Sequence, residues 1–178
     1  MRNDSKIERL VTSFRRYIEL ARNEGLFQGD LFDDFPDECC ADTSYMLAEF
    51  LLENNIETIV VSGENSKRET HAWLVVKDER VIIPEKEFFD DSEYIKKIWN
   101  SYRACEDSTP IDITHYEQRN IENGLIIDIT ADQFGEAPIY VGLANPFYES
   151  FEFHLATDFN GLHDERLVGL YKKIFNEL

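Results

Sequence analysis

Apolar residues recur every three or four positions in several segments of the chain, a spacing that gathers them on one face of an α-helix. The spacing predicts helices over residues 5–23, 40–54 and 91–104, and a terminal helix around 167–175. The apolar positions of the first, second and last of these are Ile7, Leu10, Val11, Phe14, Ile18 and Ala21; Met46, Leu47, Phe50 and Leu51; and Leu167, Leu170, Tyr171, Ile174 and Phe175.

Short apolar runs between these helices predict β-strands. The runs lie at 56–63, 71–76, 79–85, 124–134 and 137–142, with residues 77–80 as a hairpin connection. Residues 115–124 are polar and predict a loop, and His154 and His163 fall outside the predicted strands. Helices followed by several closely spaced strands favour an α+β fold with a mainly antiparallel sheet.

Composition and length limit the classes of protein to consider. The chain has 178 residues, of which 43% are hydrophobic, so it can build a sizeable core in one domain, with or without an insertion. It lacks both an apolar run of membrane-spanning length and the apolar core of a signal peptide. The sequence therefore predicts a cytoplasmic protein with no membrane association.

The formal net charge of −18 is large for this length. It argues against binding to nucleic acid or to an anionic membrane, because both depend on positive charge. It is compatible with a basic partner or substrate, with mimicry of a polyanion, and with a simple role in solubility.

Two of the three cysteines are adjacent, at Cys39 and Cys40. Neighbouring cysteines rarely form a disulfide and are a poor chelating pair, so we expect neither a bridge nor a metal. Pro36 requires the next helix to begin after it, which puts both thiols in or beside the first turn. A helix N-terminus stabilises a thiolate, whereas the acidic neighbours oppose it weakly.

His71 is the histidine best placed to activate such a thiol, because it opens the predicted strand 71–76. A third group would hold its imidazole in one tautomer, and Asp128 fits because a carboxylate within an apolar strand needs a partner. The tetrapeptide Ile-Asp-Ile-Thr occurs twice, so Asp112 is the alternative. Asp128 is preferred because its strand continues beyond it. The order nucleophile, base and orienting group is that of a catalytic triad.

These residues resemble the transglutaminase-like branch of the papain-fold cysteine enzymes. The matching motifs are Pro-x-x-x-Cys-x-x-x-Ser at 36–44, His-Ala-Trp at 71–73 and Asp-x-Thr at 128–130. The resemblance implies a nucleophile helix packed on a mainly antiparallel sheet, in a single domain over 1–178. Its core would span about 35–142, with an insertion at about 86–120 and flanking helices at both ends. The chain departs from the family pattern just before the nucleophile, where a glycine often stands and this sequence has Asp37, Glu38 and Cys39.

The resemblance also separates the candidate residues. Ser44 aligns Cys40 with the nucleophile, so the implied triad is Cys40, His71 and Asp128, with Cys39 as a bystander. Cys105 is interpreted as an incidental surface thiol. The backbone N–H of Cys40 is the preferred oxyanion donor. Gln28 is a further candidate donor to the oxyanion, although it is distant from Cys40 in the sequence. Gln133 is a further polar candidate, more simply interpreted as an ordinary side chain at the end of a strand.

Two functions follow as expectations. The first is a thiol-dependent hydrolase or acyl transferase of protease, amidase or deamidase type, which acts on a peptide or protein through a thioester intermediate. The negative net charge of the chain weakly favours a basic substrate. Such an enzyme would need no cofactor. The alternative is a catalytically silent acidic protein that binds a basic partner as an inhibitor, immunity factor or polyanion mimic. The sequence does not decide between hydrolysis and amine transfer.

Overall fold

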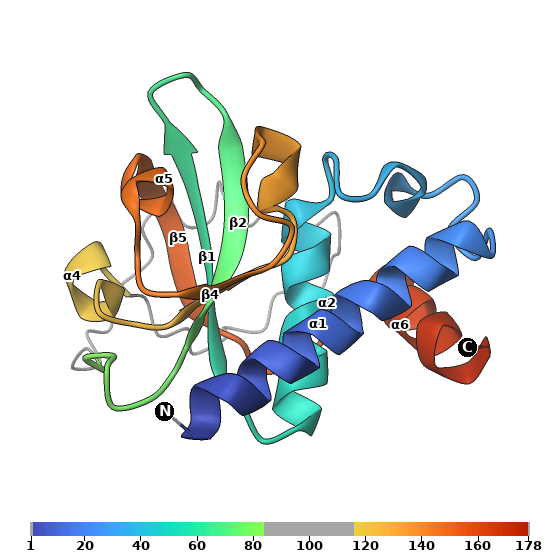
Figure 1. The fold of residues 1–178 in the computed structure, drawn as a ribbon, viewed down its shortest axis with the longest axis horizontal. Coiled ribbons are helices and arrows are strands. Elements are labelled where there is room, and N and C mark those ends of the chain that lie inside the picture. Colours follow the sequence, from blue (N-terminus) through green and yellow to red (C-terminus); the bar gives the residue numbers. More distant parts are fainter. Residues whose placement is uncertain (1, 84–115, 178) are drawn as a thin grey trace.

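The structure is a computed structural model that describes residues 2–83 and 116–177 (Figure 1). The helices and strands are, in chain order, α1 (Arg2–Asn23), the 3-10 helix η1 (Leu31–Asp34), α2 (Cys40–Glu53), β1 (Thr58–Asn65), β2 (Thr70–Val76), α4 (Gln118–Ile121), β3 (Ile126–Asp128), the 3-10 helix η2 (Ala131–Phe134), β4 (Tyr140–Gly142), α5 (Pro146–Glu149), β5 (Phe151–Asp158) and α6 (Glu165–Glu177). The predicted helix 91–104, Cys105 and Asp112 lie outside the described residues.

The described strands form one open sheet in the order β4-β3-β2-β1-β5, and every neighbouring pair is antiparallel. This arrangement confirms the predicted α+β class with an antiparallel sheet. The long strands β1 and β2 form a hairpin at its centre, with Thr58 opposite Val76 and Glu64 opposite Thr70. None of the described helices is long and apolar enough to cross a membrane.

The sheet carries a core on each face. The larger core joins one face to α1, α2 and α6, which lie together on one side of the sheet (Figure 1). Alternate residues on β2 divide between the two cores: Leu74 and Val76 belong to the larger one, Trp73 and Val75 to the second. The second core lies on the side of α4 and α5. Burial on both faces explains why β2 is a continuous apolar run rather than an alternating one.

The apolar periodicity predicted α1 well. Ile7, Val11, Phe14, Ile18 and Ala21 are all fully buried, as expected for one face of an amphipathic helix. The second predicted helix, 40–54, corresponds to α2, and the terminal one lies within α6.

The predicted strand at 79–85 is wrong over its described part. Residues 79–83 form a turn and an irregular stretch instead. The side chain of Asp78 accepts a hydrogen bond from the backbone N–H of Arg80, and Val81 donates back to the Asp78 carbonyl. This local turn bends the chain away from the sheet, a competition that aspartate often wins against regular structure.

Three other assignments differ from the sequence-based prediction. The stretch that contains His154 is the edge strand β5, and part of the predicted loop 115–124 is the short helix α4. The predicted strand 124–134 is only three residues of β3 followed by η2. It ends at Asp128 because the carboxylate of Asp128 captures the backbone N–H of Thr130.

Candidate active site

Helix α2 begins at Cys40, and Cys39 occupies its N-cap position without a side-chain capping bond. The helix therefore starts shortly after Pro36, as the sequence predicted. A first helical turn leaves backbone N–H groups free and directs the positive end of the helix dipole at the residue there. Cys40 is partly exposed, in contrast to its buried neighbour Cys39.

Cys39 lies in a different environment from Cys40. It is 1% exposed, its thiol donates to the carbonyl of Pro36, and its sulfur accepts a hydrogen bond from the Thr43 hydroxyl. Burial, with the help of its acidic and thiol neighbours, raises the pKa of the Cys39 thiol to about 12. A thiol that stays protonated at neutral pH is a poor nucleophile, which supports Cys40 as the reactive residue.

The structure brings His71 and Asp128 together. His71 lies near the start of β2 and Asp128 at the end of β3, and the two strands run in opposite directions with Leu74 paired to Ile127. The Nε2 atom of His71 is 2.6 Å from the Oδ2 atom of Asp128. Both side chains are almost fully buried, so water does not compete for this bond.

The pKa of His71 reflects both Asp128 and Cys40. Burial lowers the pKa of His71, but hydrogen bonding and charge from Asp128 and then from Cys40 outweigh it and raise the pKa to about 9. Asp128 occupies Nε2, which leaves Nδ1 as the second nitrogen of the ring. Nδ1 is buried and has no hydrogen-bond partner among the described residues.

Asp128 is held by four hydrogen bonds. Its Oδ1 atom accepts from the backbone N–H of Thr130 at 2.8 Å and from the Thr130 hydroxyl at 3.1 Å. Its Oδ2 atom accepts from His71 and, at 3.1 Å, from the Tyr148 hydroxyl. The Asp-x-Thr motif thus has a physical reason: Thr130 satisfies and orients one oxygen of a buried carboxylate, and leaves the other for histidine.

Aromatic rings surround the imidazole of His71. Their centroids lie 5.0–5.8 Å from its own, and they come from β2, η2, α5 and β5: Trp73, Phe134, Phe147 and Phe151. A low-dielectric wall of this kind strengthens the His71–Asp128 interaction. Sequence reasoning missed Tyr148, Phe147 and Phe151, although Asn145 and Pro146 are a helix-start signal. Asn145 accepts from the N–H groups of Phe147 and Tyr148.

Helix α1 braces the loops on both sides of the site. Arg15 is 7% exposed and donates to the backbone carbonyls of Ile129 and Pro138 and to both oxygens of Asp132. Its guanidinium also lies 5.1 Å from the ring centroid of Phe35. These contacts tie the segment after Asp128 to the segment before the cysteines.

The acidic neighbour within α2 is paired. Asp42 accepts a hydrogen bond from Arg166 on α6, and the same guanidinium donates to both oxygens of Asp30, at 3.0 and 3.1 Å. Asp37 and Glu38 are exposed, where their effect on a thiolate is screened by water and salt. The carboxylates around the cysteines therefore oppose ionisation less than the sequence suggests.

The remaining candidates lie outside this arrangement or have ordinary roles. Gln28 is exposed and lines a pocket of about 300 Å³ against α6, together with Arg166 and Lys173. The Gln133 side chain donates to the Thr130 carbonyl at 2.9 Å, a local bond within η2. No group of three or more metal-binding side chains occurs within residues 2–83 and 116–177.

Comparisons of the chain with models of known protein families, with curated proteins and with solved structures found no match.

Proposed function

We propose that this protein is a cysteine-dependent amide hydrolase or acyl transferase with a transglutaminase-like, papain-type fold. The observation that carries the proposal is the buried His71 imidazole, which bonds to Asp128 through Nε2 and keeps Nδ1 without a hydrogen-bond partner among the described residues. Cys40 at the start of α2 acts on the same ring, because it contributes to the raised pKa of His71. A purely structural histidine has no need of a buried carboxylate on one nitrogen and an unpaired second nitrogen. The packing of α2 on an antiparallel sheet supports the fold assignment.

The first half of the reaction forms a thioester. With its pKa raised to about 9, His71 carries a proton at neutral pH and stabilises the thiolate of Cys40. The sulfur attacks the acyl carbon of an amide, and His71 gives its proton to the departing amine. The free N–H groups at the start of α2, that of Cys40 among them, are suited to stabilise the oxyanion.

The second half releases the acyl group. His71, now neutral, takes a proton from water or from a second amine, and the resulting nucleophile attacks the thioester carbon. The carbon–sulfur bond breaks, and Cys40 leaves as a thiolate beside the newly protonated His71. Asp128 keeps its charge throughout and stabilises each imidazolium state. Water gives a carboxylic acid, and an amine gives a new amide.

Acylation by an activated ester tests this proposal directly. We expect p-nitrophenyl acetate to acetylate Cys40 in a rapid burst, detected by release of p-nitrophenol and by peptide mass spectrometry. Cys39→Ala should keep the burst, because Cys39 is buried and protonated. Cys40→Ala and His71→Ala should lose it. A burst that survives Cys40→Ala, or acetylation spread over several thiols, would overturn the assignment.

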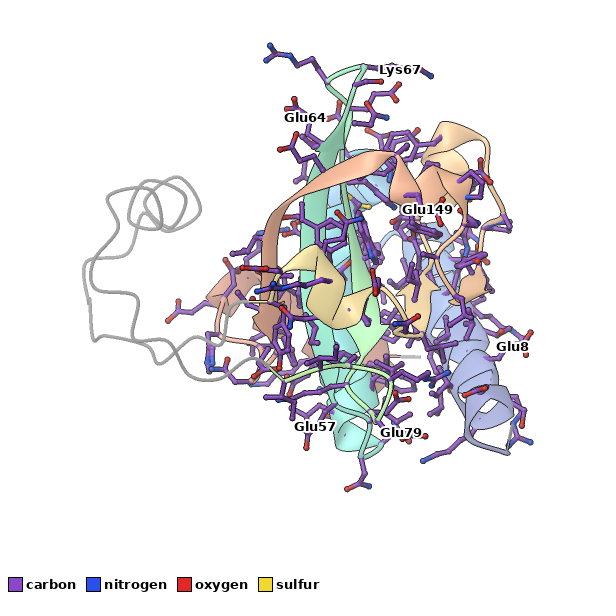
Figure 2. The ribbon with its side chains drawn as sticks, turned by 90° about the vertical axis from the view of Figure 1, so that its left-hand side faces the viewer. Glu8, Glu57, Glu64, Lys67, Glu79 and Glu149 are labelled. Carbon is purple, nitrogen blue, oxygen red and sulfur yellow. The ribbon has the colours of Figure 1, made fainter. Side chains whose placement is uncertain are left out.

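The second candidate function is binding of a basic partner without catalysis. The net charge of −18 motivates it. Figure 2 labels the exposed residues Glu8, Glu57, Glu79 and Glu149, which come from α1, the position just before β1, the turn after β2 and α5. The acidity is thus spread over the surface, which favours solubility over a single docking face. Salt-sensitive binding to a basic protein that survives Cys40→Ala would support this candidate instead.

A further inference from the structure

Tyr148 is a buried group that the triad chemistry does not use. It is 3% exposed, and its hydroxyl donates at 3.1 Å to Oδ2 of Asp128, the same oxygen that accepts from His71. Burial first, and then the charge and hydrogen bond of Asp128, raise the pKa of Tyr148 far above its usual range. The phenol therefore remains a hydrogen-bond donor throughout the working pH range.

The two oxygens of Asp128 have different tasks. Thr130 saturates Oδ1 with two bonds and fixes the rotation of the carboxylate. Tyr148 and His71 share the charge on Oδ2. Thr130 alone therefore fixes the orientation of the Asp128 carboxylate. The Tyr148 hydroxyl instead changes how much negative charge on Oδ2 is available to the His71 imidazole.

We propose that Tyr148 is a positioning residue that acts through Asp128, where it draws charge away from Oδ2 and so sets how tightly His71 holds its proton. The proposal rests on the proposed function, and it adds a fourth member to Cys40, His71 and Asp128. Helix α5, which carries Tyr148, begins at Pro146 and is capped by Asn145, so the hydroxyl is fixed by local structure rather than by a flexible loop.

Among the described residues, few titratable groups act on this pair. Cys40 from α2 and Asp128 from β3 interact with His71, and Tyr140 from β4 and Glu136 after η2 act on Tyr148 by charge alone. The described rings that pack on His71 are aromatic and carry no charge: Trp73, Phe134, Phe147 and Phe151. A change at the Tyr148 hydroxyl therefore reaches His71 through Asp128.

The experiment is an NMR titration of His71 in the Cys40→Ala background, where the thiol no longer couples to the ring. Tyr148→Phe removes one donor from Oδ2, so that oxygen binds the imidazolium more tightly. We expect the titration midpoint of His71 to rise by about half a pH unit, and the Nε2 proton signal to move downfield. Tyr171→Phe is the matched control, because its buried hydroxyl donates to Glu53 at 2.7 Å, away from the site.

A second variant keeps the test decisive if Tyr148→Phe does not fold. Site-specific 3-fluorotyrosine at position 148 keeps the ring and makes the hydroxyl a stronger donor, so the midpoint of His71 should fall. Shifts of opposite sign for the two changes support the proposal, since a merely structural role predicts neither. A midpoint that stays within the range of the Tyr171→Phe control would overturn it.

This result is separable from failure of the proposed function. The His71 titration is measured without Cys40, so it reports on Tyr148 whether or not the thiol is a nucleophile. Acetylation of Cys40 in the wild-type chain reports on the reaction whether or not Tyr148 affects His71. The two proposals can therefore fail independently.

Discussion

His71 and Asp128 are 57 residues apart in the chain, yet a 2.6 Å hydrogen bond joins their buried side chains. The antiparallel pairing of β2 with β3 brings them together, and Thr130 fixes the carboxylate that receives the bond. This pair fixes the imidazole, because it occupies Nε2 and leaves Nδ1 as the second nitrogen of the ring.

Removing the charge of Asp128 should disable the site without changing its shape. We expect Asp128→Asn to lower the rate of acetylation by about 10²–10⁴-fold, because the imidazolium loses its counter-charge and its fixed tautomer. Burst kinetics with p-nitrophenyl acetate measure the loss. The control is Asp158→Asn, since Asp158 also accepts from a buried tyrosine, Tyr116, but outside the site. Equal rates in the two variants would contradict the role of Asp128.

The raised pKa of His71 should make stability depend on pH. Its value is about 9 in the folded protein and about 6.5 in an unfolded chain, so the protonated form stabilises folding. This contribution is complete below about pH 6.5 and is lost as the pH rises through about 9. We expect the free energy of unfolding to fall by about 2 kcal/mol between pH 6.5 and 8.5.

Urea unfolding at several pH values measures this dependence. His71→Gln should flatten the curve in that window, because the titrating group is gone. Cys39 interferes little, because its contribution begins to fall only near the ordinary thiol pKa of 9.0, where the unfolded chain starts to ionise, and that lies above this window. A curve of equal slope in the variant would show that His71 is not the group responsible.

Arg15 should matter more to stability than any exposed arginine. Arg15→Leu leaves Asp132 and two backbone carbonyls without their donor, and we expect a loss of about 3 kcal/mol in the free energy of unfolding. Arg119→Leu is the control, because its ion pair with Glu117 is exposed. Similar melting temperatures for the two variants would contradict the bracing role of α1.

Gly169 offers a stabilising substitution. It lies inside α6, and a Cβ atom built on it meets no atom within 4 Å. Gly169→Ala should therefore raise the free energy of unfolding by about 1 kcal/mol, the difference in helix propensity between the two residues. Chemical denaturation measures the gain. A loss of stability would mean that the pocket beside α6 needs the space that glycine leaves.

The sequence was sufficient to predict those parts of the fold and of the candidate site that depend on neighbouring residues alone. Pro36 set the start of α2, and apolar spacing predicted α1 and the burial of its inner face. The placement of His71 at a strand opening and of Asp128 within an apolar strand led to the pair that the structure joins.

Other features depend on partners far away in the chain. Arg15 has the sequence context of a solvent-facing helix residue, and its burial follows from carbonyls more than a hundred residues away. Tyr148 lies in a helix of four residues, and its place in the site depends on the hydrogen bond to Asp128, which lies 20 residues earlier on β3. The false strand at 79–83 arose because apolar content outweighed the turn that Asp78 forms with its own backbone.

The most direct test of the proposed thiolate–imidazolium pair is the alkylation rate of each cysteine by iodoacetamide as a function of pH, followed by peptide mass spectrometry in wild type and His71→Ala. We expect Cys40 to react rapidly at pH 6.5, Cys39 to stay unreactive, and His71→Ala to slow Cys40 to the rate of an ordinary thiol. The alkylation rate of Cys40 could instead rise with pH as for an ordinary thiol, with a midpoint near ~8.5, and be unchanged in His71→Ala. In that case the thiolate–imidazolium pair does not exist and the proposed chemistry is wrong.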